Sequence, residues 1–71
     1  MNLIENTPDR RVYLWCGHRA EITLRDRCRW CWRVLDHGTV VGRGSRYTLD
    51  RARRDVEIVI EAAEAAERIP A

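Results

Sequence analysis

The sequence predicts a small α+β domain in which an antiparallel meander of three or four strands packs against one C-terminal amphipathic helix, in the order β-β-β-β-α. Apolar and polar residues alternate from residue 11 onward, turn residues interrupt the alternation, and the apolar spacing changes to steps of three and four after residue 48. The 71 residues allow one hydrophobic core. We expect residues 1–9 to form a flexible N-terminal arm and residues 10–71 to form a single domain.

The first two strands are predicted by alternation with a period of two. In residues 11–16 the even positions are expected to face the core, so that Arg11, Tyr13 and Trp15 face outward. Gly17-His18 predicts a turn. In residues 19–25 the even positions are again apolar, and the odd positions are expected to face solvent.

The third and fourth strands follow in the same way. In residues 29–35 the alternation places Trp30 and Trp32 in the core and the odd positions outside. Asp36-His37-Gly38 predicts a hairpin loop, because glycine accepts the positive φ that such loops require. A fourth strand is expected over residues 39–42, and the glycine-rich residues 42–45 are interpreted as a flexible connection to the helix.

The helix is predicted to begin after Thr48, whose hydroxyl can accept a hydrogen bond from a free backbone N–H of the first turn. Apolar residues then recur on one face, and Pro70 ends the helix. The C-terminal half carries a surplus apolar seam, formed by Ile58, Ala62, Ala65 and Ile69. Two explanations stay open: the seam forms a homodimer, or a wide sheet or the N-terminal arm covers it.

Charge is distributed unevenly along the chain. All thirteen basic residues are arginines, and the net charge is +2. Residues 1–54 hold twelve arginines and six acidic residues, whereas residues 55–71 hold one arginine and five acidic residues. This asymmetry predicts a basic sheet and an acidic helix, with an acidic partner for the sheet or head-to-tail self-association. The exclusive use of arginine fits both codon bias and selection for bidentate contacts with carboxylates or phosphates.

Neither a metal site nor a catalytic site is predicted. Cys16, His18, Cys28 and Cys31 are residue types that bind zinc, but a strand over residues 19–25 would hold the two pairs roughly 20 Å apart. The histidines lie in predicted turns, without a nucleophile or an orienting acid. We therefore expect no cofactor, no metal and no enzymatic activity. Without an apolar run near the ~20 residues of a membrane span, we expect a cytoplasmic protein that does not contact membranes.

The outward face of the sheet is the candidate partner-binding surface, because arginine and aromatic residues are enriched at binding hot spots. Its candidate residues are Arg11, Tyr13, Trp15, Arg19, Arg25, Arg29, Arg33 and Arg43. An acidic surface of a protein complex would suit this face. Nucleic acid would also suit it, through stacking of bases on the aromatic rings and arginine contacts to phosphates. The modest net charge favours the protein partner.

Three features resemble those of small phage- or mobile-element-encoded accessory proteins, including the anti-CRISPR inhibitors. They are Trp30-x-Trp32-x-Val34, Asp36-His37-Gly38 and Ala62-Ala63-Glu64-Ala65-Ala66. The resemblance transfers no functional residue and implies only stoichiometric occlusion of a larger host complex. The expected function is a non-catalytic protein that binds and inhibits or modulates such a complex, for example a CRISPR-Cas defence system. The alternative is a nucleic-acid-binding module.

Overall fold

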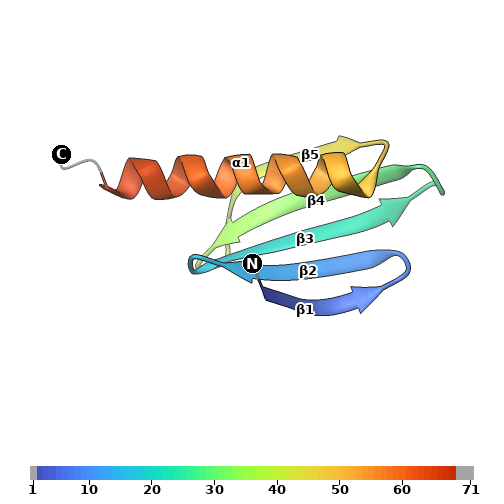
Figure 1. Cartoon of the computed structure of the whole chain (residues 1–71), viewed down its shortest axis with the longest axis horizontal. Helices are drawn as coiled ribbons and strands as arrows, with labels where there is room; N and C mark the ends of the chain where they lie inside the picture. Colours follow the sequence, from blue (N-terminus) through green and yellow to red (C-terminus); the bar gives the residue numbers. More distant parts are fainter. Residues whose placement is uncertain (1, 69–71) are drawn as a thin grey trace.

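The structure, a computed structural model, describes residues 2–68 and shows a five-stranded antiparallel sheet followed by one helix (Figure 1). The elements are β1 (Asn2–Thr7), β2 (Arg10–Trp15), β3 (His18–Arg25), β4 (Arg29–Asp36), β5 (Thr39–Arg46) and α1 (Leu49–Arg68). Each strand pairs with the next one in sequence, which gives the spatial order β1-β2-β3-β4-β5. The predicted α+β meander with a C-terminal helix is confirmed, with one strand more than expected.

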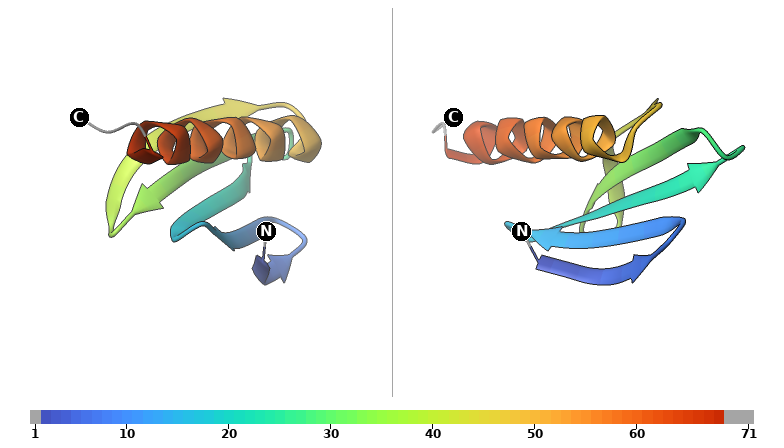
Figure 2. Two further views of the ribbon diagram at one scale, coloured as in Figure 1. Left: turned by 60° about the vertical axis from the view of Figure 1, so that its left-hand side comes forward. Right: turned by 45° about the vertical axis from the view of Figure 1, so that its right-hand side comes forward.

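The molecule has two layers. Helix α1 lies along one face of the sheet and contacts β3, β4 and β5, while β1 and β2 continue beyond it (Figures 1 and 2). Within the described residues, no element covers the opposite face of the sheet, here called the open face. The side chains of this face therefore have no second layer packed over them.

The core lies between α1 and the middle strands. Ala20, Ile22 and Val34 from the sheet and Val56 and Ile60 from the helix are completely buried. Trp32 is 8% exposed, and Trp30 packs against the same cluster, so the predicted placement of both tryptophans in the core is confirmed. A bidentate ion pair between Arg46 and Asp55, with Nε–Oδ2 at 2.7 Å, ties β5 to the helix at the edge of this core.

Residues 2–7 form a paired edge strand, which differs from the loose arm expected for residues 1–9. Asn2 lies opposite Leu14, and Thr7 lies opposite Arg10. The register shifts between Leu3 and Glu5, which inserts an extra residue into the strand. A bulge of this kind breaks the alternation of side chains, and the period-two signal that predicts a strand is consequently missing from this segment.

Strand β5 continues through residues 42–45, so the flexible connection expected there is wrong. The glycines instead allow close packing. A Cβ atom on Gly42 would lie 2.8 Å from Cγ1 of Val59, and one on Gly44 would lie 2.8 Å from Cζ2 of Trp32. Glycine in a strand often marks such a close approach, and here it leaves space for the helix and for the large indole ring.

The helix begins as predicted. The backbone N–H of Arg51 donates to Oγ1 of Thr48 at 3.2 Å, which satisfies one of the free donors of the first turn. Asp50 lies in that turn, where the helix dipole favours a negative charge. Pro70, the predicted end of the helix, lies outside the described residues. Over residues 2–68 the structure contains no helix with the length and apolar character to cross a bilayer.

Candidate functional site

The open face is defined by the register of the strands. Residues that share a face lie opposite one another across the ladder, as Arg10, Thr23, Cys31 and Ser45 do. The arginines that this register places on the open face are Arg10, Arg19, Arg25, Arg29, Arg33 and Arg43. The five of these that lie in β3–β5 occupy the face that the sequence predicts for them, and their role in binding stays a prediction.

Strand β2 presents the opposite set of side chains to the helix from the set that the sequence predicts. Tyr13 pairs with Ala20 on the helix side, is 7% exposed and belongs to the core cluster, and Trp15 packs against that cluster. Arg11 lies opposite Ile22 and shares this face. The expected outward placement of Arg11, Tyr13 and Trp15 is therefore wrong. Both the odd-numbered and the even-numbered positions of this strand carry apolar side chains. In the structure the positions with the larger aromatic rings face the core.

Arg10 is the open-face arginine that sequence reasoning missed. Because the even-numbered residues of β2 face away from the helix, the side chain of Arg10 lies on the open face. It is within hydrogen-bond distance of Glu21 (Nη2–Oε2, 3.3 Å). It also pairs with Glu5 of β1 at 2.6 Å. The sequence indicates an open-face arginine here only through the adjacent pair Arg10 and Arg11, because two neighbouring residues of a strand point to opposite faces.

Glu21 is the centre of the arginine cluster. Its Oε2 accepts hydrogen bonds from Arg10 and from Nε of Arg19 at 3.0 Å, and its Oε1 accepts one from Nε of Arg33. The glutamate is only 7% exposed. Burial by itself would raise the pKa of Glu21, but hydrogen bonds from Arg33 and Arg19, with the charges of Arg33 and Arg10, lower it. An ionised Glu21 therefore holds three guanidinium groups in fixed positions.

Three other arginines of the open face have no acidic partner within residues 2–67. Arg25 lies directly opposite Arg29, and Arg43 lies directly opposite Arg33. Like charges in directly opposed positions destabilise a sheet. With six arginines against Glu5 and Glu21, the open face has an excess of four positive charges, which an anionic partner would relieve.

A hollow of about 590 Å³ lies among these arginines. Its lining residues are Arg10, Glu21, Thr23, Arg25, Cys31, Trp32, Arg33, Arg43, Gly44 and Ser45. Four arginines, a threonine and a serine contribute guanidinium and hydroxyl groups to this lining. A surface so rich in donors suits carboxylates or phosphates, which arginine binds in a bidentate manner.

The other end of the open face is apolar. Leu14, Leu35 and Val40 occupy one row across the ladder and are here called the apolar row, with Arg19 between the first two. Leu14 is 43% exposed and Val40 is 45% exposed. The open face thus combines a basic end with an exposed apolar end.

The surplus seam of the helix lies on the surface. Ile58 is 54% exposed, Ala62 and Ala65 are exposed, and Ile69 lies outside the described residues. The N-terminal residues, one of the proposed coverings, lie in β1 at the far edge of the sheet (Figure 1). A homodimer through the seam stays a prediction.

Changing Ala62 to glutamate tests the predicted homodimer. The new charge would be buried between two helices, so we expect a dimer in wild type and a monomer in Ala62→Glu. Light scattering at matched concentrations measures both masses, with Arg53→Glu, exposed on the opposite side of the same helix, as the control. A monomeric wild type at millimolar concentration would exclude the dimer.

The cysteines lie apart, as the predicted strand requires. Strand β3 spans His18–Arg25, with Cys16 before one end and Cys28 after the other. Cys16 and Cys28 are exposed, and Cys31 is half-buried on β4. The four residues Cys16, His18, Cys28 and Cys31 therefore do not converge on one ion.

Comparison of the chain with protein-family models, with curated proteins and with solved structures gave no match.

Proposed function

We propose that this chain is a non-catalytic binding protein that docks its open face on an acidic and partly apolar surface of a larger protein. The observation that carries the proposal is the continuity of the arginine cluster with the apolar row on one face. Protein interfaces combine an apolar centre with arginine and a polar rim. A phosphate backbone, by contrast, offers nothing for Leu14 and Val40 to pack against.

The arrangement of charge supports an anionic partner. The acidic residues of α1 belong to the opposite layer, so the open face is strongly basic although the whole chain carries only +2. Charge concentrated in this way steers a partner of opposite sign into the right orientation. Because Glu21 already holds Arg10, Arg19 and Arg33, these side chains lose little conformational entropy on binding.

Binding of this kind would modulate the partner by occlusion. The chain offers one broad face, which suits stoichiometric masking of a surface on a larger complex. Because the chain resembles phage-encoded accessory proteins, the first partner to test is a host complex, such as a CRISPR-Cas defence complex.

Nucleic acid is the second candidate, favoured by Arg25, Arg29 and Arg43, which have no acidic partner within residues 2–67. Tyr13 lies in the core and Trp15 packs on the helix side, so the stacking of single-stranded bases that the sequence predicts is lost. What remains is contact with phosphates, for which a duplex is the suitable ligand.

Two substitutions distinguish the candidates: Arg43→Ser at the basic end and Val40→Ser in the apolar row. If the partner is a protein, each is expected to weaken binding by about tenfold, because hot-spot residues contribute this much. If the ligand is duplex DNA, Arg43→Ser weakens binding and Val40→Ser leaves it unchanged. Arg54→Ser, on the helix layer, is the matched control.

The measurement combines quantitative crosslinking in host lysate with titration of a labelled DNA duplex at about 20 and 200 mM salt. Capture of a protein that depends on both Arg43 and Val40 supports the first candidate. Affinity for the duplex that falls steeply with salt and is unchanged by Val40→Ser supports the second candidate. Capture and duplex binding that both variants leave intact would refute the open face as the binding surface.

A further inference from the structure

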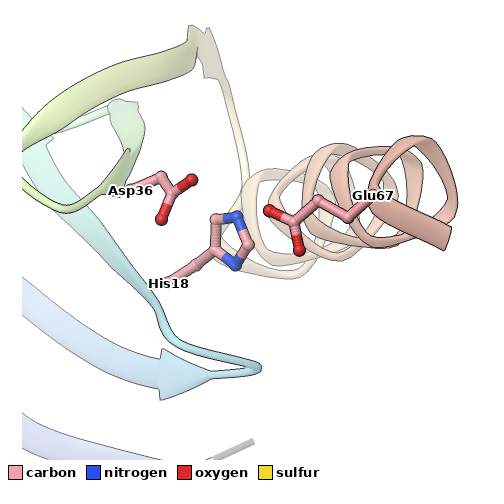
Figure 3. Close-up of side chains that lie close together, drawn as sticks. All are labelled: His18, Asp36 and Glu67. Carbon is pink, nitrogen blue, oxygen red and sulfur yellow. The ribbon is translucent and has the colours of Figure 1, made fainter. Parts of the chain in front are cut away.

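His18, Asp36 and Glu67 come together where the C-terminal turn of α1 passes the end of the sheet (Figure 3). Their ligand atoms all lie within 4.8 Å of one another. His18 and Asp36 are directly opposite each other on neighbouring strands, and Glu67 lies in the last turn of the helix. No motif of short spacing links these residues, and the sequence predicts no metal site from them.

Two tight turns place the sheet residues of this cluster. Cys16 and Gly17 have φ values of 53° and 77°, and His37 and Gly38 have values of 50° and 82°. These are the positive angles of two-residue hairpin turns, whose twist matches that of the flanking strands. His18 directly follows the first turn and Asp36 directly precedes the second, so both side chains are fixed at the same end of the sheet.

The ring of His18 is held as a ligand would be. It is 2% exposed, and its Nδ1 lies 3.0 Å from the backbone oxygen of Cys16. Because a carbonyl oxygen only accepts, Nδ1 carries the hydrogen and the neutral ring has its lone pair on Nε2. That Nε2 is buried and has no hydrogen-bond partner in the described part of the chain. An unsatisfied buried nitrogen is costly, and a metal ion would satisfy it.

We propose that Nε2 of His18 and the carboxylates of Asp36 and Glu67 bind a divalent first-row transition-metal ion, with Zn²⁺ as the best fit. Imidazole nitrogen with carboxylate oxygen is a donor set that Zn²⁺ accepts, whereas Ca²⁺ and Mg²⁺ prefer oxygen alone. The Nδ1–H donated to a backbone carbonyl is the outer contact that metal-binding histidines generally make. This site is separate from the open face.

The distances are compatible with coordination. Three atoms no more than 4.8 Å apart place a central ion at most about 2.8 Å from each of them. Zinc bonds of ~2.0–2.2 Å then require only small rotations of the carboxylate side chains. Three protein ligands leave a fourth position for water or for a donor from a partner, as in zinc sites that remain open.

The surrounding charges favour a cation. The C-terminal end of a helix carries partial negative charge, which adds to the two carboxylates. The ring of His37 already contacts Asp36, with its Nδ1 2.8 Å from Oδ1 of the carboxylate. Its side chain is 94% exposed, so it can turn away at little cost. A bound ion would tie the end of α1, which extends past the sheet (Figure 1), to β3 and β4.

Zinc titration of the metal-free protein tests the site. The three cysteines are changed to serine first, because free thiols bind zinc themselves. We expect one Zn²⁺ per chain by calorimetry and a melting temperature that rises with zinc concentration. Glu67→Gln, at an exposed helical position, is expected to weaken zinc binding at least about tenfold.

Several controls make the result decisive. Glu57→Gln removes an acid ten residues earlier on the same helix and is expected to leave zinc binding unchanged. Asp36→Asn is expected to act like Glu67→Gln, and circular dichroism checks the fold of each variant. No rise in melting temperature at millimolar zinc would overturn the proposal. Binding that survives Glu67→Gln, or an equal response to Ca²⁺, would also overturn it, since either would mean that this donor set is not the ligand.

Discussion

Replacing Gly44 with valine is expected to lower the melting temperature by about 5–20 °C. Trp32 lies directly across the ladder from Gly44, and its ring occupies the space that a side chain would need. A Cβ atom at this position would meet Cζ2, Cε2 and Nε1 of the ring at 2.8–3.1 Å. Overpacking a core contact costs about 1–3 kcal/mol, and each kcal/mol shifts the melting temperature of a domain this size by about 4–8 °C.

Ser45→Val is the matched control for this experiment. It adds similar bulk at the next residue of β5, but on the open face, where no element packs. Thermal unfolding of both variants by circular dichroism gives the comparison. Equal melting temperatures for Gly44→Val and Ser45→Val would show that the approach of Trp32 to β5 does not constrain the fold.

Replacing Glu21 with glutamine is expected to destabilise the protein by about 1–2 kcal/mol at pH 7. Breaking a fully buried ion pair costs about 3–5 kcal/mol, whereas exposed pairs contribute about 0–1 kcal/mol. Glu21 is buried, but the side chains of Arg10, Arg19 and Arg33 are 35%, 46% and 55% exposed and can turn to water. The expected value is therefore between the two limits.

The effect of Glu21 must also depend on pH. The pKa of Glu21 in the folded protein lies below its ordinary value of 4.5, so the carboxylate stabilises the fold above that pH. This contribution is lost as the pH falls through the lowered pKa. Urea unfolding between pH 7 and pH 2.5 should show wild type converging on Glu21→Gln at the acid end.

Glu5→Gln is the control for the glutamate experiment. Glu5 lies on the same face and pairs with Arg10 alone, with 44% of its side chain exposed, so about 0.5 kcal/mol or less is expected. A difference between wild type and Glu21→Gln that persists unchanged at pH 2.5 would contradict an electrostatic role for Glu21.

The parts of the fold that follow from the sequence are those with one consistent signal. The helix has a cap at Thr48 and an uninterrupted apolar stripe, and both β3 and β4 alternate between apolar and mostly polar positions. In β2 both faces are apolar, and the structure buries Val12 completely as well as Tyr13. Alternation therefore predicts that β2 is a strand, but it cannot decide which face points to the helix.

The remaining differences depend on contacts between distant residues. Gly44 belongs to a strand because Trp32 fills the space beside it, and nothing in residues 42–45 indicates this contact. The candidate metal ligands His18 and Glu67 lie 49 residues apart in the sequence. They meet only because the hairpin turns and the end of α1 reach the same corner of the molecule (Figure 3).

The irregularities in the two outer strand pairs bear on aggregation. Neither β1 nor β5 has a strand on its outer side among the described residues, and such edges can recruit strands from other molecules. The register shifts in both outer pairs, between Leu3 and Glu5 in β1 and beside Leu35 in the β4–β5 pair. A shift of this kind bends the strand and interrupts its row of donors and acceptors. The two bulges therefore oppose edge-to-edge growth into fibrils. They help to prevent strands of other molecules from adding to the two free edges of the five-stranded sheet.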